Sequence, residues 1–478
     1  MTLMRSGWLH LASGAGVGRV LGFASNLLLT RWMGPMDLGL FNLVITTVQT
    51  SDTLARCGGD YALNFELGGQ PNAIQTERGT QLAHGLAQIC SVTTVFICIG
   101  VAVWIWWGHG LFPIELPGSR RLILTIFLIL MISCEAICAS GWEVLLVSHR
   151  TARLALRQGL FVPMRLFFAA IGSLFGGVSG AMCGWSIVAF MQFFWLRSVL
   201  GHLWTPLQIL PLIGNTVRQL LRRGLPFYVS NLLSSIIFFP LLLKVAAGSG
   251  LDDIGYLKAG QILQQLFAFL PATLVPVLFL KLRSQSNFME QVTLIEKPLR
   301  IIWLLLLEVL LLYWSFDNSL ILWLFGTSFL PALVPTRLLL LTALLECLAQ
   351  VIVQPLLAAG KTRSYGLWQN GTAVISAVLG WLWIPSSGLA AYLIVRLFYV
   401  IIPLIGFGFP LITHLNEPRK ILSLSLVTII LLVSSLVQIL TEVTFVSSAP
   451  LLSVFFVAIL ILHRHDLLLL CRNIRMSS

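Results

Sequence analysis

Long apolar segments, separated by short polar ones, make up most of the chain. Residues 299–316 and 421–439 are nearly unbroken apolar runs, and each approaches the roughly twenty residues that a helix needs to cross a bilayer. Applied along the whole chain, the same criterion predicts about fourteen transmembrane helices. They are expected at 8–31, 38–63, 80–107, 122–147, 156–174, 180–200, 225–247, 255–280, 299–316, 338–359, 365–384, 388–409, 421–439 and 450–462. The predicted fold class is therefore an all-α polytopic membrane protein.

The first twelve spans form two sets of six that resemble each other. The sequence DLGLF at 37–41 begins the second span, and DIGYL at 253–257 begins the eighth, 216 positions later. Glu135 and Glu346 lie near the middles of the fourth and tenth spans, 211 positions apart. Because six is even, both sets enter the membrane in the same direction. This predicts two lobes related by an axis along the membrane normal, with a binding cavity between them.

The repeat divides the chain into predicted domains. They are a six-helix lobe at 1–200, a basic cytoplasmic linker at 201–224, a second six-helix lobe at 225–412, and two additional helices with a basic tail at 413–478. The linker contains Arg218, Arg222 and Arg223, so it fits either a helix lying on the cytoplasmic leaflet or a plain connection.

Composition and charge agree with a membrane protein. Hydrophobic residues make up 57% of the chain and charged residues only 10%, whereas soluble domains carry about 25% charged residues. The net charge of +12 comes from basic residues scattered between spans, which argues against nucleic acid as a partner. Connections on the side of the N-terminus hold twenty Lys and Arg residues, and those on the opposite side hold six. This bias predicts a multi-pass protein of the cytoplasmic (inner) membrane with both termini in the cytoplasm.

Charged residues inside the spans are the candidate functional groups, because each costs roughly 2.5–3.5 kcal/mol at the bilayer centre. Arg19, Arg165 and Arg396 are candidate substrate-binding residues, since a guanidinium stays charged in a low dielectric and grips phosphate through two hydrogen bonds. The carboxylates are candidate counter-ions or proton carriers: Asp52, Glu135, Glu346 and Glu308. The alternative for all of them is a set of buried ion pairs that fixes helix register.

Depth along the spans suggests specific partners for these charges. Asp52 can pair with Arg19 or with Arg56, one turn further on. Arg165 lies at about the depth of Glu143, and Arg396 at about the depth of Glu346. Glu308 has no evident partner in the sequence.

The sequence shows none of the common catalytic, nucleotide-binding or zinc-binding motifs. The chain contains no GxSxG, HExxH, Walker or zinc-type spacing, and its eight cysteines form no CxxC pair. We therefore expect neither an enzyme nor a cofactor or metal.

Two stretches of sequence resemble a known transporter family. RVLGF at 19–23 followed by MGPMDLGLF at 33–41 is similar to the opening of Wzx-type oligosaccharide flippases, although Met36 and Leu38 depart from that pattern. LFGTSF at 324–329 followed by PLLAAGK at 355–361 resembles the family's second recognisable stretch. These flippases belong to the multidrug/oligosaccharidyl-lipid/polysaccharide exporter superfamily.

The resemblance implies a function and partners. It implies two lobes that alternate between inward and outward openings. The implied substrate is an anionic polyprenyl-diphosphate-linked oligosaccharide, turned from the inner to the outer leaflet for polysaccharide biosynthesis. It also implies Arg19 as a diphosphate contact, and glycosyltransferases and a polysaccharide polymerase as partner proteins. Two alternatives stay open: a cation-coupled drug or small-molecule antiporter of the same superfamily, and a membrane-embedded polysaccharide polymerase or ligase.

Overall fold

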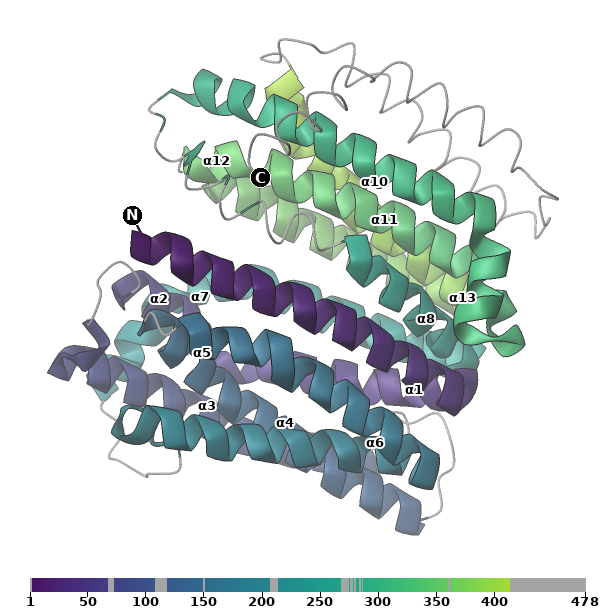
Figure 1. The fold of residues 1–478 in the computed structure, drawn as a ribbon, viewed down its shortest axis with the longest axis horizontal. Coiled ribbons are helices and arrows are strands. Elements are labelled where there is room, and N and C mark those ends of the chain that lie inside the picture. Colours follow the sequence, from purple (N-terminus) through teal and green to yellow (C-terminus); the bar gives the residue numbers. More distant parts are fainter. Residues whose placement is uncertain are drawn as a thin grey trace. The chain divides into compact units, whose positions relative to one another are not determined.

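The computed structural model of the protein is almost entirely helical over the residues that it describes (Figure 1). The described residues are 2–67, 73–107, 118–148, 151–206, 214–267, 287–359 and 362–412, together with 275, 278, 281, 282 and 285. The predicted last two spans and the C-terminal tail, 413–478, lie outside them.

Helices of five to 55 residues follow one another along the chain. They are α1 (Thr2–Arg56), α2 (Gly59–Leu67), α3 (Glu77–Trp107), α4 (Gly118–Val147), α5 (Thr151–Leu156), α6 (Val162–Leu200), α7 (Gly214–Ser249), α8 (Leu251–Phe267), α10 (Phe288–Phe325), α11 (Leu333–Ile352), α12 (Gln354–Ala358) and α13 (Thr362–Ile412). Short turns connect some of them: η1 (Ala73–Gln75), η2 (Arg157–Phe161), η3 (Gly201–Leu203) and η4 (Thr327–Ala332). Within the described residues, six helical segments are long and apolar enough to cross a membrane. A thirty-residue helix such as α4 is about 45 Å long, which exceeds the roughly 30 Å hydrocarbon core.

Glycines with positive φ mark the predicted outer turns. Gly34 (φ 72°), Gly177 (φ 54°) and Gly388 (φ 51°) interrupt α1, α6 and α13, so each of these helices contains two predicted spans. Gly250 (φ 98°) separates α7 from α8, and Gly326 (φ 96°) ends α10. This backbone conformation is costly for residues with a Cβ, which explains why glycine occupies all five turns.

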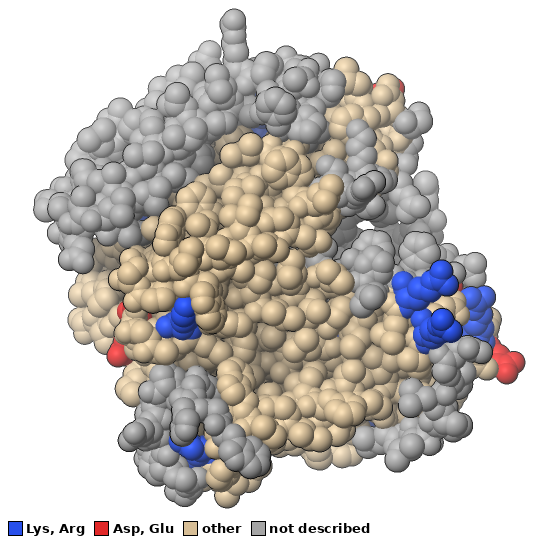
Figure 2. Space-filling view, turned by 180° about the vertical axis from the view of Figure 1, so that it is seen from behind, with Lys and Arg blue, Asp and Glu red and all other residues tan. Residues whose placement is uncertain are grey.

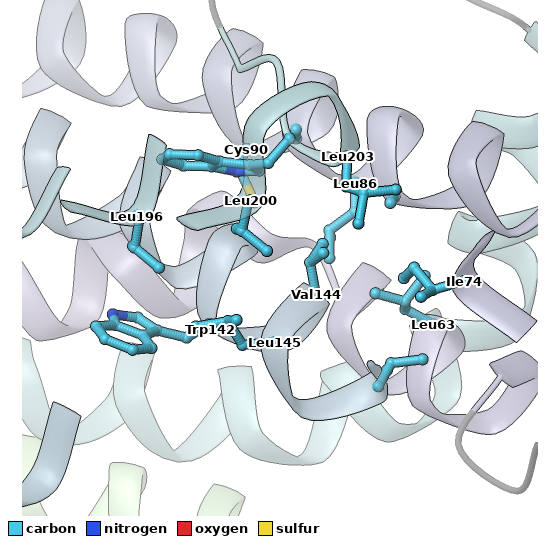
Figure 3. Packing of buried hydrophobic residues seen from close by; sticks show 14 of the residues in the cluster. Leu63, Ile74, Leu86, Cys90, Trp142, Val144, Leu145, Leu196, Leu200 and Leu203 are labelled. Carbon is cyan, nitrogen blue, oxygen red and sulfur yellow. The ribbon is translucent and has the colours of Figure 1, made fainter. Parts of the chain in front are cut away.

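The chain forms two compact units, Met1–Lys258 and a second one beginning at Ala259. In the first unit, Trp142 of α4 packs with Leu196 and Leu200 of α6, while Leu86 and Cys90 of α3 belong to the same apolar cluster (Figure 3). In the second unit, α11 packs against α10 and α13. Most of the visible surface carries neither basic nor acidic side chains, and the charged ones gather in a few places (Figure 2). The molecule is a multi-pass membrane protein by this architecture.

The first twelve predicted spans each overlap a described helix, with three differences in extent. The second span, 38–63, is broken at Cys57 and Gly58, which both have positive φ. The ninth, 299–316, is the middle of the much longer α10. Residues 214–224 of the predicted linker are the first turns of α7. Leu220 there is buried and Arg222 is exposed, so this basic segment packs on the first unit through its apolar side.

Candidate functional site

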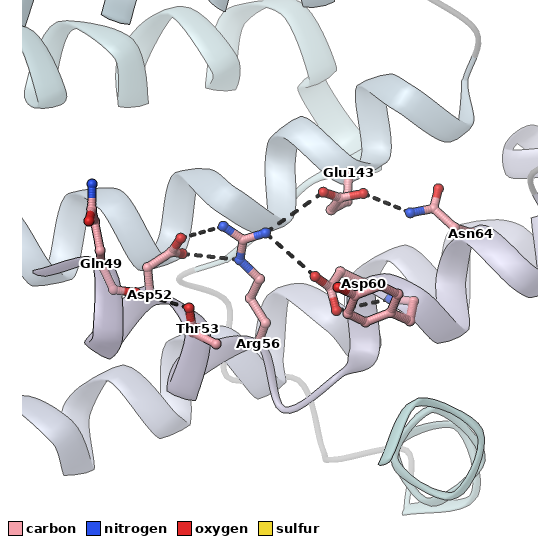
Figure 4. Close-up of polar contacts among 8 residues, drawn as sticks. Gln49, Asp52, Thr53, Arg56, Asp60, Asn64 and Glu143 are labelled. Atoms are coloured by element: carbon pink, nitrogen blue, oxygen red, sulfur yellow. Dashed lines mark hydrogen bonds and ion pairs between the residues drawn. The ribbon is translucent and has the colours of Figure 1, made fainter. Parts of the chain in front are cut away.

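A cluster of charged residues surrounds Arg56 at the end of α1 (Figure 4). Asp52, one helical turn earlier, forms an ion pair with the Arg56 guanidinium. Arg56 Nη1 lies 3.5 Å from Asp60 Oδ2 of α2 and 3.9 Å from Glu143 Oε1 of α4. Asn64 Nδ2 donates a 2.8 Å hydrogen bond to the other oxygen of Glu143. Three carboxylates therefore share this guanidinium, and Arg157 also interacts electrostatically with Glu143 and Asp52. With all of these groups ionised, three negative charges face two positive ones.

A break in the second span lies inside this cluster. Cys57 (φ 47°) and Gly58 (φ 75°) end α1, and α2 begins at Gly59. Arg56 and Asp60 are four residues apart across the break, a spacing at which side chains on one helix face also meet. The cluster therefore joins residues of α1, α2 and α4.

A second cluster is built around Arg165 in the first half of α6. Its guanidinium forms an ion pair with Glu135 of α4 and donates a hydrogen bond to the amide oxygen of Gln192, in the second half of α6. Trp185 Nε1 donates a 3.1 Å hydrogen bond to Glu135 Oε1, and its ring centroid is 5.7 Å from the guanidinium carbon. Both charged side chains are largely buried, at 8% and 13% exposure. The pair is thus enclosed by one amide and one aromatic ring.

The second unit contains a related cluster around Arg396, in the second half of α13. Arg396 Nη2 lies 3.5 Å from Glu346 Oε1 of α11. The Gln264 amide of α8 contacts both partners: Nε2 donates to Glu346 at 3.1 Å, and Oε1 accepts from Arg396 at 3.4 Å. Tyr392, one turn before Arg396, also hydrogen-bonds it. The predicted proximity of Arg396 and Glu346 is therefore present as an ion pair.

Glu135 and Glu346, the repeat-related carboxylates, each bind one arginine and have a glutamine beside the pair. The arginines come from different positions in the repeat, since Arg165 belongs to the fifth span and Arg396 to the twelfth, which corresponds to the sixth. The two carboxylates occupy corresponding positions of the predicted repeat, but their arginines come from different positions of it.

The structure changes one pairing suggested by depth alone. Arg165 pairs with Glu135, whereas Glu143 lies beside Arg56. Asp52 pairs with Arg56, which was one of its two suggested partners. Arg19 lies half-buried in the first half of α1, in the part where Gly22 packs against Leu166 of α6.

Glu308 lies near the middle of α10, and within the described part of the chain its buried Oε1 has no hydrogen-bond partner. The site residues proposed from the sequence therefore occupy several places. Arg165 with Glu135 and Arg396 with Glu346 form pairs, Asp52 joins the Arg56 cluster, and Glu308 lies apart on α10.

Sequence reasoning overlooked the uncharged partners. Gln192, Gln264, Asn64 and Trp185 each hydrogen-bond a buried charge. Polar amides inside apolar runs are the signal that could have found the first three. Arg157, near the predicted inner end of the fifth span, was not a candidate either, and its guanidinium lies over the Trp142 ring, 5.5 Å from the centroid.

Comparison with known proteins shows the fold but not a sequence family. Neither a family model nor a curated protein sequence matches the chain. Among solved structures, the chain is similar to the lipid II flippase MurJ in an inward closed conformation, with a TM-score of 0.72 and 12% identity, covering 95% of this chain and 99% of that one. It is also similar to an inward-facing multidrug resistance MATE family transporter of the MOP superfamily, with a TM-score of 0.63 and 14% identity, covering 84% and 96% of the two chains.

A third similar structure is a MOP superfamily transporter from Pyrococcus furiosus, with a TM-score of 0.56 and 15% identity, covering 86% and 96% of the chains. At these identities the comparisons show that the chain has the fold shared by MurJ and the MATE transporters.

Proposed function

We propose that this protein is a flippase that turns an anionic, polyprenyl-diphosphate-linked oligosaccharide from the inner to the outer leaflet by alternating access, for polysaccharide biosynthesis. The observation that carries the proposal is the extent of the likeness to a lipid II flippase, which covers 95% of this chain, against 84% and 86% for the other two MOP superfamily transporters described above. The resemblance of residues 19–41 to Wzx-type flippases supports the same substrate class.

Arginines inside predicted spans give the proposal its chemistry. Arg165 and Arg396 are each held by a carboxylate of the same unit, so neither is an uncompensated charge while the site is empty. A diphosphate can replace such a carboxylate, because guanidinium binds phosphate oxygens through two parallel hydrogen bonds. Arg19 is the proposed diphosphate contact, and Glu135 and Glu346 are the counter-ions released when the substrate binds.

A cation-coupled antiporter is the second candidate, and one observation favours it. Asp52, Asp60 and Glu143 outnumber Arg56 and the nearby Arg157, so this cluster carries more negative than positive charge. An excess of buried carboxylates suits a protein that carries protons or cations. Under this alternative, Glu143→Gln abolishes resistance to cationic drugs while Arg19→Ala does not.

The flippase function is tested by measuring how much lipid-linked oligosaccharide accumulates on the inner leaflet of cells that carry each variant. We expect Arg19→Ala to abolish transport with near-normal protein levels. Arg19→Lys should restore transport only in part, because ammonium keeps the charge but loses the two-pronged geometry. Arg31→Ala is the matched control, since Arg31 is an exposed arginine of the same helix. Full transport by Arg19→Ala would refute the anion-binding role. The polymerase and glycosyltransferase partners stay a prediction.

A further inference from the structure

Two glycines related by the internal repeat contact each other's helix at the predicted outer end of the first unit. Gly39 lies in the second half of α1, and Gly255 lies 216 positions later in α8. A Cβ added to Gly39 would overlap the carbonyl of Leu251, and one added to Gly255 would overlap the carbonyl of Pro35. Pro35 and Leu251 are also 216 positions apart. Each helix therefore places its glycine against the same backbone position of the other.

The residues around this outer crossing follow the same relation. Gly34 and Gly250, the positive-φ turns that precede the two helices, are 216 positions apart. Leu38 and Ile254 are 216 positions apart as well, and both are fully buried at 0% exposure. Four pairs at one constant shift indicate a local two-fold axis through the crossing, which random helix packing would not produce.

A second glycine crossing lies at the inner end of the same span. A Cβ on Gly58 would overlap the carbonyl of Gly224 in α7, and a Cβ on Gly224 would overlap the carbonyl of Gly58. Tyr228, one turn after Gly224, donates a 3.1 Å hydrogen bond to the Leu54 carbonyl. The 23 helical steps between positions 35 and 58 correspond to about 35 Å, or roughly the thickness of the hydrocarbon core. One span is therefore held at both membrane surfaces.

We infer that these two crossings are the gates of the transport pathway: the second half of α1 closes against α8 on the outer side and against α7 on the inner side. Sides are assigned by the Lys and Arg bias, and the inference rests on the proposed transport function. Backbone-to-backbone contact excludes water and solutes because no side chain holds the helices apart. It also lets the helices separate without breaking ion pairs, since such contacts depend on van der Waals packing and weak Cα–H···O interactions.

Valine substitutions test the gates by preventing one crossing at a time. Gly39→Val blocks the outer crossing and Gly224→Val blocks the inner one. Gly100→Val is the matched control, because Gly100 lies in helix α3 and an added Cβ there meets nothing within 4 Å. Accessibility is read by a membrane-impermeant maleimide applied from one side. Half-buried Cys57 reports on the inner crossing and Leu38→Cys on the outer one, in a background without the other seven cysteines.

Opposite responses are expected from the two variants. Gly39→Val should raise labelling of Leu38→Cys from outside by about tenfold or more and leave Cys57 labelling from inside unchanged or lower. Gly224→Val should raise Cys57 labelling and leave Leu38→Cys protected. Gly100→Val should match the parent protein at both sites. Equal labelling in all three folded variants would overturn the inference.

Folding and substrate identity are controlled separately. Size-exclusion chromatography shows whether each variant folds, and Gly39→Ala and Gly224→Ala replace the valine variants if those do not. If the alanine variants also fail to fold, the crossings are structural contacts and the inference is wrong. Labelling does not require a substrate. Two results can therefore be told apart. If labelling shifts as expected but lipid-linked oligosaccharide transport in cells does not depend on the protein, the proposed substrate is refuted and the gate inference still holds.

Discussion

The two Arg–Glu pairs should contribute unequally to stability. Glu135→Gln removes the negative charge that faces Arg165, and Glu346→Gln does the same for Arg396. The side chains of Arg165 and Glu135 are 8% and 13% exposed, and Gln192 is then the remaining acceptor described for Arg165. Removing one partner of a buried pair costs about 3–5 kcal/mol, because the other charge stays buried without compensation. We expect about 3 kcal/mol for Glu135→Gln.

The second pair is looser. Its N–O distance is 3.5 Å, its side chains are 21% and 33% exposed, and Gln264 and Tyr392 still hydrogen-bond Arg396 in the variant. The expected cost of Glu346→Gln is about 1 kcal/mol, near the range for exposed pairs. The free energy of unfolding measured in mixed detergent micelles gives both values. Equal losses in the two variants would refute the argument from burial.

A double variant separates stability from transport at the buried pair. In Glu135→Leu with Arg165→Leu neither charge is left uncompensated, so stability should return to within about 2 kcal/mol of the parent. If Arg165 binds the head group, this stable protein should still fail to transport lipid-linked oligosaccharide. Normal transport by the double variant would show that the pair only fixes helix packing.

Three further predictions concern topology, packing and Glu308. Maleimide labelling should find Arg222→Cys on the cytoplasmic side and Ser387→Cys outside, and reversed labelling would overturn the order of spans. Gly180→Leu should lower the free energy of unfolding in detergent by more than about 2 kcal/mol, because a Cβ there overlaps the Gly172 carbonyl across the α6 hairpin. Gly371→Leu should cost far less, because a Cβ on Gly371 meets nothing within 4 Å. Glu308→Leu should unfold no more easily than the parent, since its buried carboxyl oxygen has no described partner, but transport should fall if Glu308 carries a coupling proton.

Helices and turns were predictable because their signals are local. Apolar length identifies spans, and Gly34 followed by Pro35, or Gly176 followed by Gly177, indicates where one span ends and the next begins. The break at Cys57 was missed because it falls inside an apolar run, where a single glycine is compatible with a continuous helix.

Charge pairing was less predictable because depth does not define which way a helix faces. Arg165 was placed level with Glu143, but the pairing partner is Glu135, about two turns away on the same helix. Glu135 and Glu143 are also about 12 Å apart along the helix axis, so counting residues from a turn misjudged the height as well as the direction that the helix faces. Glutamine partners such as Gln264 were overlooked because only ionisable residues were considered.

The positive-φ glycines also determine how much of the chain is exposed on its predicted outer side. At Gly34, Gly177, Gly250 and Gly388, helix follows helix almost directly, so these connections present hardly any backbone beyond the membrane surface. Added proteases would find little to cut there, and antibodies would find little to bind. An inserted epitope tag would have to open the turn itself. Detection tags and fusion partners therefore belong away from these four turns, on the predicted cytoplasmic side.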